Sequence, residues 1–311
     1  MNQVTNSILM IRPSSFRANE QTAVNNFYQK NSIELPQDEL QKRAQGEFDN
    51  FVEKLRGVGV NVIVFESNDG LDTPDSHFPN NWVSFHENGT VGLYPMFAEN
   101  RRLERREAIF LELEEKGFKI KNFVDYTSAE EENLFLEATG SLILDRVNRK
   151  AYCALSQRAD EDLFIEFCED FDYFPIIFTA NQTVEGKRKP IYHTNVMMCV
   201  GETFAVVCLS SIDDKNERKN VIKHLKENNK EIIDITEEQV NNFSGNLLEV
   251  IGKSDSRILV MSEAAHNAFT PNQILKLEKH GKILSSPLTV IEDCGGGSAR
   301  CMMAEVFLPK A

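Results

Sequence analysis

Apolar residues along this chain follow two spacings, short runs with a period of two and longer stretches with a period near 3.6, and these alternate in a fixed order. Residues 82–94 read as two strands joined at an Asn-Gly turn, residues 99–117 as an amphipathic helix that ends at glycine, and residues 118–126 as a third strand. Charges of both signs alternate along the helix, which is typical of a solvated face. The pattern therefore predicts a strand-strand-helix-strand unit.

The same order of elements recurs later in the chain. Three further copies are predicted, at residues 141–180, 195–235 and 246–287. A fifth copy forms only if both ends of the chain combine, with strands at 299–309 and 7–13, a helix at 38–57 and a strand at 60–66. We therefore expect one domain over residues 1–311, whose fifth unit is closed by the N-terminal and C-terminal segments.

Units of this kind cannot bury their apolar faces alone, so they usually stack or close into a ring. Five units predict an α/β fold in the form of a fivefold pseudosymmetric α/β propeller. The alternative is a doubly wound parallel sheet, which also alternates strands and helices but prefers one strand per helix over tight hairpins.

One polar residue recurs just before, or at the start of, the first strand of each unit, at intervals of 53 to 56 residues. If the units surround an axis, these positions converge on one pocket. The pocket would hold a thiol, an imidazole and a carboxylate, the groups that nucleophilic catalysis by cysteine requires. The five residues are Asn81, Glu137, His193, Asn246 and Cys301.

Composition narrows the classes of partner. The chain has 48 acidic and 34 basic residues and a formal net charge of -14 without a long basic run, which opposes binding to nucleic acid or to an anionic membrane. A small-molecule substrate is favoured. The apolar stretch that ends at Arg12 is too short for a signal peptide, no stretch approaches the length of a membrane span, and we expect a cytoplasmic protein.

Cofactor chemistry is not indicated. The six cysteines show no disulfide framework and no Cys-x-x-Cys pair, so most should be reduced, buried and inert. No metal-binding arrangement is evident, and the glycine-rich stretch "GGGSAR" (295–300) lacks the lysine of a phosphate-binding loop. We expect neither a metal nor another cofactor.

Five short stretches together resemble the guanidine-modifying enzyme superfamily. This group includes arginine deiminases, agmatine deiminases, dimethylarginine dimethylaminohydrolases and amidinotransferases, and the resemblance implies a fivefold α/β propeller, the pentein fold. It covers nearly the whole chain and keeps the motifs in order. The stretches are "PDSHFPNN" (74–81), "LEATGS" (136–141), "LSQRAD" (155–160), "HTN" (193–195) and "GGGSARCM" (295–302).

The resemblance implies roles for individual residues. Cys301 would be the nucleophile, His193 the general acid and base, and Glu137 the carboxylate that engages the substrate nitrogens or orients the site. Arg158 would receive the substrate α-carboxylate, as a forked donor can. Two further implications follow: Arg101 is a second candidate for that end of the substrate, and Asp75 would lie near its amino group. Cys294 is expected to be a bystander, because only Cys301 occupies the recurring position.

The chain departs from arginine deiminases at two positions. Where those enzymes hold the guanidinium with aspartates, this chain has Asn81 and Asn195. An amide offers a donor and an acceptor to a neutral group, whereas a buried carboxylate without a cation is costly. We therefore expect a ureido substrate.

The leading hypothesis is a cofactor-free cysteine hydrolase that converts L-citrulline to ornithine, carbon dioxide and ammonia through a covalent Cys301 adduct, as the similar citrulline utilisation hydrolases do. An arginine deiminase or an amidinotransferase is the alternative among enzymes, and a propeller that binds an amino acid or a protein without chemistry is the alternative of another class. Asn246 either takes part in the site or only bonds a strand end, and a homo-oligomer is possible.

Overall fold

The structure is a computed structural model that describes residues 2–66 and 70–310. Within these residues the strands form five three-stranded sheets and one two-stranded hairpin. Each three-stranded sheet has the same plan, in which the middle strand pairs antiparallel with one neighbour and parallel with the other. The protein therefore has a mixed α/β fold built from many small sheets, as the apolar pattern predicted.

The elements follow the predicted units closely. The first sheet comprises β3 (Val83–Phe85), β4 (Thr90–Leu93) and β5 (Asn122–Asp125), with η1 (Pro79–Asn81), α3 (Glu99–Arg102), α4 (Glu107–Glu115) and η2 (Thr127–Glu132) around it. The second comprises β6 (Leu142–Asp145), β7 (Lys150–Ala154) and β8 (Phe174–Phe178), with α5 (Ala138–Ser141) and α6 (Glu161–Asp170). The third comprises β11 (Met198–Val200), β12 (Phe204–Val207) and β13 (Glu231–Asp234), with α7 (Thr194–Met197), η3 (Leu209–Ser211) and α8 (Lys215–Glu227).

The other two sheets use the end of the chain and its beginning. The fourth comprises β14 (Leu248–Ile251), β15 (Arg257–Ser262) and β16 (Lys282–Ser286), with α9 (Glu237–Val240), η4 (Lys253–Asp255), α10 (Glu263–Ala268) and α11 (Pro271–Leu277). The fifth comprises β17 (Ala304–Glu305), β1 (Ser7–Arg12) and β2 (Asn61–Glu66), with α1 (Glu20–Ala23), α2 (Gln37–Gly57) and α12 (Thr289–Gly295). The hairpin of β9 (Asn181–Val184) and β10 (Lys187–Pro190) is an addition that the apolar pattern did not indicate.

Helix α2 illustrates how the sequence produces these elements. Apolar side chains spaced three or four residues apart, at Leu40, Ala44, Phe48, Phe51 and Leu55, are all buried. Removing a side chain such as Phe48 from water stabilises the fold by about 1.5–3 kcal/mol. The helix contacts β1, β2, β16 and α12, so it holds the C-terminal loop region against the fifth sheet.

The predicted helix over 99–117 begins at Glu99 as expected but is interrupted after one turn. Helix α3 ends at Arg102 and α4 begins at Glu107, with extended backbone at Arg106. Arg101 and Glu104 form an ion pair and are 2% and 1% exposed, so this segment turns inward instead of presenting a solvated face. Alternating charge alone does not distinguish a buried ion pair from a solvated one.

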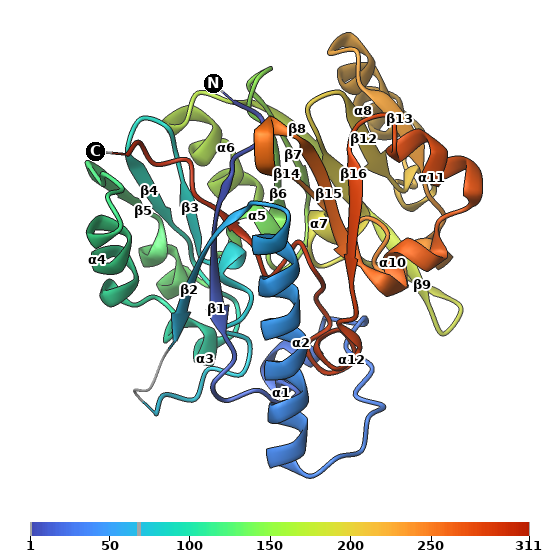
Figure 1. Ribbon diagram of the computed structural model, residues 1–311. Coiled ribbons are helices and arrows are strands. Elements are labelled where there is room, and N and C mark those ends of the chain that lie inside the picture. The colour runs from blue at the N-terminus through green and yellow to red at the C-terminus, as the bar shows by residue number, and fades with distance from the viewer. Residues whose placement is uncertain (1, 67–69, 311) are drawn as a thin grey trace.

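Neighbouring units contact each other in chain order. The turn η1 contacts α5, which contacts α7, and β17 contacts β3. Thr5 accepts a hydrogen bond from the backbone N–H of Ile251 at 3.0 Å and so links the fourth unit to the fifth. In Figure 1, helices α2, α4, α8 and α11 lie outside the strands, both chain ends lie at the top, and α1 and α12 lie at the bottom.

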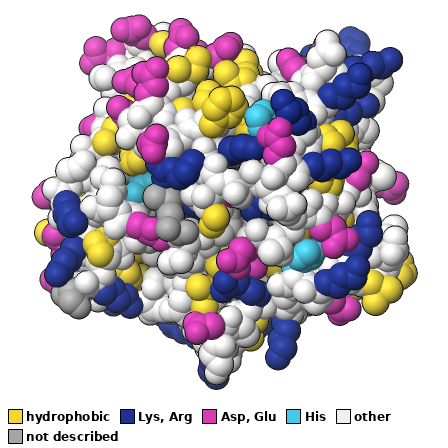
Figure 2. Space-filling view, turned by 90° about the horizontal axis from the view of Figure 1, so that it is seen from above, with side chains coloured by type: hydrophobic (Ala, Val, Ile, Leu, Met, Phe, Trp, Pro, Cys, Tyr) yellow, Lys and Arg dark blue, Asp and Glu magenta, His cyan; other side chains and the backbone are white. Residues whose placement is uncertain are grey.

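The surface carries mixed charge. On the face seen from above, Lys and Arg side chains are interspersed with Asp and Glu (Figure 2). Within the described residues, no helix combines the length and the apolar character needed to cross a membrane.

Candidate active site

Four of the five recurring polar residues lie in tight turns that lead into an edge strand of a sheet, namely β3, β6, β11 or β17. Asn81 ends η1, Glu137 precedes α5, His193 precedes α7, and Cys301 lies shortly before β17. Short helical turns of this kind change the chain direction just before each strand, so residues far apart in sequence meet. These side chains are all 2% exposed or less.

The Cys301 sulfur receives two amide hydrogen bonds. Asn195 Nδ2 lies 3.4 Å from Sγ and Asn246 Nδ2 lies 3.2 Å from it. The Asn246 amide is fixed from both sides, because it accepts from the Arg300 N–H at 3.0 Å and donates to the Asn195 carbonyl at 3.0 Å. Asn246 therefore does more than bond a strand end: it contacts the sulfur directly.

Glu137 and His193 form a buried pair. His193 Nε2 and Glu137 Oε2 are 2.6 Å apart, and Arg158 Nη1 lies 3.5 Å from the same oxygen. Burial lowers the pKa of His193 to about 4, although the hydrogen bond and charge of Glu137 act to raise it. Burial acts to raise the pKa of Glu137, but the charge of Arg158 and the hydrogen bond with His193 outweigh it and lower the pKa to about 2. At neutral pH the pair is a carboxylate and a neutral imidazole whose Nε2–H faces the carboxylate, which leaves Nδ1 as a proton acceptor.

Arg101 is engaged by protein groups. Its Nη1 donates to Asn81 Oδ1 at 2.7 Å, and its Nε and Nη2 donate to the two carboxylate oxygens of Glu104 at 2.9 and 3.0 Å. A carbonyl of Phe78 accepts a further bond from Nη2 at 3.1 Å. The Asp75 carbonyl accepts another at 3.4 Å, so the guanidinium is held among five acceptor atoms.

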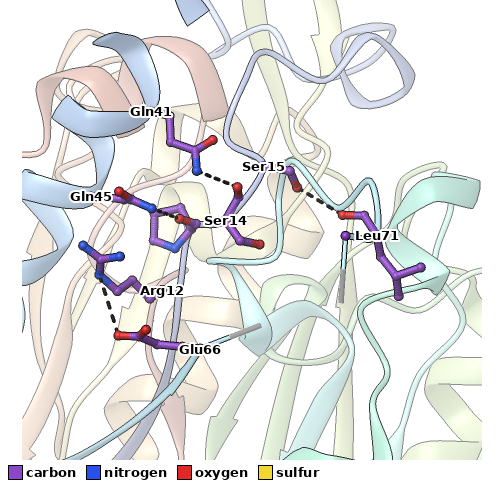
Figure 3. A pocket seen from close by; sticks show the side chains of 9 residues that line it. Arg12, Ser14, Ser15, Gln41, Gln45, Glu66 and Leu71 are labelled. Carbon is purple, nitrogen blue, oxygen red and sulfur yellow. Dashed lines mark hydrogen bonds and ion pairs between the residues drawn. The ribbon is translucent and has the colours of Figure 1, made fainter. Parts of the chain in front are cut away.

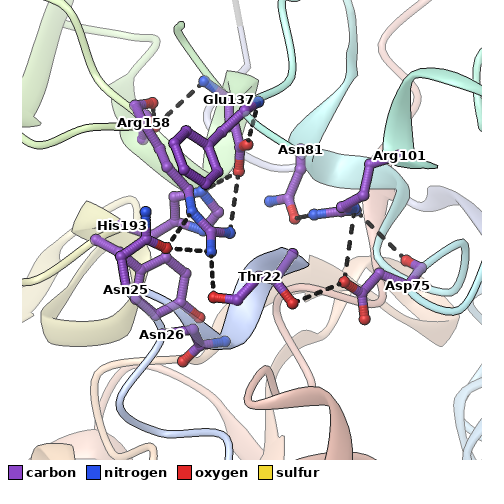
Figure 4. A network of polar contacts seen from close by, with 12 residues as sticks. Thr22, Asn25, Asn26, Asp75, Asn81, Arg101, Glu137, Arg158 and His193 are labelled. Carbon is purple, nitrogen blue, oxygen red and sulfur yellow. Dashed lines mark hydrogen bonds and ion pairs between the residues drawn. The ribbon is translucent and has the colours of Figure 1, made fainter. Parts of the chain in front are cut away.

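The segment around α1 covers these side chains. Thr22 contributes its carbonyl to Arg158 Nη2 at 2.9 Å and its hydroxyl to Asp75 Oδ2 at 3.2 Å (Figure 4). Asn25 accepts from Arg158 Nε at 2.9 Å, and Asn19 donates to Asp75 Oδ2 at 2.8 Å. Arg158 and Asp75, which were expected to hold the carboxylate and the amino group of the substrate, are therefore bonded to the segment around α1.

The pocket beneath this segment is small. The residues around it include Asp75, Asn81, Arg101, Arg158, His193 and Cys301, together with Thr22, Asn26, Phe78, Tyr192, Gly295 and Gly297. Its free volume is about 10 Å³, roughly the space that one water molecule needs. The pocket in this state has no room for an amino acid.

The glycine-rich stretch forms the turn that presents Cys301. Gly296 has φ +63°, a left-handed conformation that favours glycine, and its carbonyl accepts from Tyr192 Oη at 2.8 Å. Ser298 accepts the Cys301 N–H at 3.0 Å and donates its hydroxyl to Glu292 Oε1 at 2.6 Å. Burial raises the pKa of Glu292 to about 7. Glu292 thus holds the glycine-rich turn in place through its hydrogen bond with Ser298.

A second cavity lies beside the start of α2 (Figure 3) and contains polar groups that bond to each other. Gln41 and Gln45 donate to the carbonyls of Ser14 and Pro13, and Arg12 forms two bonds of 2.8 Å to Asp49. Among the residues that the structure describes, those that line it include no cysteine or histidine. These hydrogen bonds hold residues 13 and 14, which lead into the segment around α1, against helix α2.

Metal and disulfide chemistry receive no support from the described residues. In residues 2–66 and 70–310 no group of three His, Cys, Asp or Glu side chains could hold a metal ion. All six cysteines are buried and unpaired, and Cys294 lies inside α12.

Several site residues escaped the sequence analysis. Glu104 follows Arg101 by three residues, a spacing that places opposite charges side by side on a helical turn and was a usable signal. Tyr192 precedes His193, and its ring lies 4.7 Å from the Arg158 guanidinium. Thr22 and Asn25 belong to a polar stretch, residues 17–36, with a helix-like segment; the sequence left open whether this stretch covers the pocket, and it did not single out these two residues.

Comparisons with known proteins identify a family and a shared fold. The model of the family described as "N,N dimethylarginine dimethylhydrolase, eukaryotic" matches residues 12–308. Among solved structures, the N-terminal domain of ArgZ bound to product, an arginine dihydrolase from the ornithine-ammonia cycle in cyanobacteria, has 20% identity and a TM-score of 0.71, covering 97% of this chain and 99% of that one. A dimethylarginine dimethylaminohydrolase adduct has 13% identity and a TM-score of 0.63, with 97% and 99% coverage.

Full-length ArgZ is longer than this chain. The apo structure has 19% identity and a TM-score of 0.72, and the match covers 98% of this chain but only 41% of ArgZ. At these identities the structural likeness establishes the fold alone. No curated protein matches the chain.

Proposed function

The chain belongs to the N,N-dimethylarginine dimethylhydrolase family, a group of hydrolases of carbon–nitrogen bonds other than peptide bonds, and from this premise we propose that it hydrolyses the ureido group of L-citrulline. The products are ornithine, carbon dioxide and ammonia. Cys301 is the nucleophile in this proposal, and no cofactor takes part.

The observation that carries the substrate assignment is the uncharged surroundings of the sulfur. Both groups that bond Cys301 Sγ are amides, from Asn195 and Asn246. Arg101 and Arg158 bring two cations to the pocket. The nearby carboxylates are already engaged by these arginines, so a guanidinium would have to share a carboxylate with a cation of the protein. A ureido group is neutral and meets no such repulsion.

The proposed first step forms a bond between Sγ and the ureido carbon. Neutral His193 takes the thiol proton at Nδ1, while Glu137 holds the ring through Nε2–H and stabilises the imidazolium. The amide donors of Asn195 and Asn246 also stabilise negative charge on the sulfur. His193 then gives its proton to the departing nitrogen, and the carbon–nitrogen bond breaks.

The proposed second step uses water. His193 accepts a proton from the water as its oxygen attacks the carbonyl carbon of the Cys301 adduct, the sulfur leaves, and the released carbamate decomposes to carbon dioxide and an amine. Citrulline and one water thus give ornithine, carbon dioxide and ammonia.

At the other end of the substrate, we propose that Arg158 receives the α-carboxylate and Asp75 the α-ammonium. Both are buried, and both now bond to Thr22. The Thr22 carbonyl and hydroxyl occupy the positions that the carboxylate and ammonium of an amino acid would take. Substrate binding would then replace contacts of the covering segment with similar contacts of its own.

A guanidino substrate such as arginine is the second candidate. Asn195 Oδ1 is buried without a hydrogen-bond partner among the described residues, and it would accept an N–H of a guanidinium as well as one of a ureido group. Similarity to ArgZ, a protein named as an arginine dihydrolase, also favours this second candidate.

We also propose that the five sheets close into a single fivefold propeller. The support is the shared plan of the sheets and the contacts that lead from each unit to the next, including β17 with β3. The catalytic turns would then surround its axis, within one domain.

Incubation with citrulline, arginine, N,N-dimethylarginine and agmatine tests the function. Equal amounts of ornithine and ammonia from citrulline are expected, with little or no turnover of the other three. Cys301→Ala should be inactive, and Cys294→Ala, a buried cysteine of the same region, should retain activity. Turnover of arginine or dimethylarginine without turnover of citrulline would refute the proposal.

A further inference from the structure

The orientation of the Asn81 amide determines what it offers a substrate. Its oxygen is already taken, because Arg101 Nη1 donates to Oδ1 at 2.7 Å. Its nitrogen points away from Arg101 toward the side of the pocket that holds His193 and Glu137 (Figure 4). One hydrogen of Nδ2 bonds to Asn80 Oδ1 at 3.1 Å, which leaves the second hydrogen as a donor.

Glu104 prevents Arg101 from turning. The two residues form a bidentate pair of 2.9 and 3.0 Å, and Arg101 is also bonded to the Phe78 carbonyl. Both side chains are almost wholly buried. Paired forks of this kind fix direction as well as distance, so the contact between Arg101 Nη1 and Asn81 Oδ1 has little freedom to exchange.

We propose that Glu104 is a positioning residue which, through Arg101, fixes the Asn81 amide with its N–H toward the reacting carbon and thereby selects a carbonyl oxygen. This inference rests on the proposed function and extends it, because it assigns the choice of substrate to a residue outside the pocket.

The chemistry of the two substrate groups explains the selection. A ureido group presents an oxygen that accepts a hydrogen bond, and this oxygen gains negative charge when the sulfur attacks. A guanidinium presents only N–H donors. An N–H fixed at Asn81 therefore stabilises the ureido oxygen and opposes binding of a guanidinium. If the amide could turn, it would offer its oxygen to a guanidinium.

A double-mutant cycle tests the inference. Glu104→Gln, Asn81→Ala and the double variant are compared with the unchanged protein for kcat and KM on citrulline and arginine. Glu104→Gln should lower kcat/KM for citrulline by about 10- to 100-fold, the effect expected when a charged hydrogen bond is lost, mainly in kcat. Arginine turnover should fall less or rise. In the Asn81→Ala background, Glu104→Gln should change kcat/KM by less than about threefold, because the amide that it orients is gone.

Glu130→Gln is a matched control. Glu130 holds Arg105 with bonds of 2.6 and 3.0 Å, a similar fork that lies outside the pocket lining. The Glu130→Gln substitution should leave the ratio of citrulline to arginine turnover unchanged. If Glu104→Gln lowers both substrates equally, or acts as strongly without Asn81 as with it, Glu104 has only a structural role and the inference fails.

The outcome is separable from that of the proposed function. If the unchanged protein hydrolyses arginine and not citrulline, the proposed function fails at once. The coupling between Glu104 and Asn81 is then measured on arginine, and a coupling above tenfold still supports the positioning role, whereas additivity overturns it.

Discussion

Gly140 lies so close to Asn81 that a Cβ atom at this position would be 2.4 Å from Asn81 Nδ2. The same Cβ would lie 2.9 Å from two atoms of the His193 ring. Contacts this short require one side chain to move. We therefore expect Gly140→Ala to displace the Asn81 amide or the imidazole and to lower kcat by 100-fold or more, since small misplacements in an active site have effects of about this size.

Gly46→Ala is the matched control for this substitution. No atom lies within 4 Å of the added Cβ in α2, and alanine favours a helix by about 1 kcal/mol over glycine. Activity should persist and the melting temperature should rise. Full activity of Gly140→Ala would contradict the packing described for this turn.

Asn246 provides a test of charge beside the sulfur. Asn246→Asp retains an oxygen for the Arg300 N–H but replaces the donor at Cys301 with a charged acceptor. Negative charge opposes formation of a thiolate. Alkylation of Cys301 by iodoacetamide at neutral pH should slow by 100-fold or more, and by only about tenfold in Asn246→Ala. Equal rates in the two variants would show that packing, not charge, matters at this position.

The contact between Asn25 and Arg158 predicts how easily the pocket opens. Asn25 Oδ1 accepts from two nitrogens of Arg158, and Asn25→Ala removes both bonds. Loss of hydrogen bonding to a charged group costs about 1.5–3 kcal/mol, which converts to roughly 10- to 150-fold. Alkylation of Cys301 without substrate should accelerate by about that factor. An unchanged rate would mean that opening does not require this contact to break.

Glu292 predicts a dependence of stability on pH. Burial raises its pKa to about 7 in the folded protein, so its protonated form is favoured there more than in the unfolded chain. The stabilisation is complete below the unfolded pKa of about 4.5 and is lost as the pH rises through 7. Relative to the unchanged protein, Glu292→Gln should therefore become more stable between pH 4.5 and 8, by up to about 3 kcal/mol.

Denaturant titrations at several pH values measure this difference. Glu53→Gln, a change at an exposed position of α2, should show no such trend. A flat difference for Glu292→Gln would indicate that the carboxyl is solvated or paired in solution.

The sequence predicted the strands, the main helices and the polar residues at the turns because these follow from local spacing. Apolar periodicity defines which face of an element is buried, and a constant interval places equivalent residues in equivalent turns. Cys301, His193, Glu137 and Asn81 were therefore identified without a structure. Their proposed roles remain to be tested by the experiments above.

The rest depends on contacts between distant segments. Arg101 was expected at the carboxylate end of the substrate, but its neighbours Glu104 and Asn81 are defined only after α3 turns inward. Thr22 lies in the short helix α1 and bonds both Arg158 and Asp75, and apolar periodicity does not indicate which distant side chains such a polar segment contacts. Whether an amide presents its oxygen or its nitrogen is likewise decided by its partners.

The pairing of β17 with β1 also bears on the order of events during synthesis. Cys301 lies just before β17, which pairs antiparallel with β1, a strand that precedes all the other described strands in the chain. The strands of the other four sheets must therefore be synthesised before the Cys301 sulfur can take its place beside Asn195 and Asn246. A nascent chain would carry the imidazole and the carboxylate early, yet it would gain its reactive centre only when the last strand joins the first.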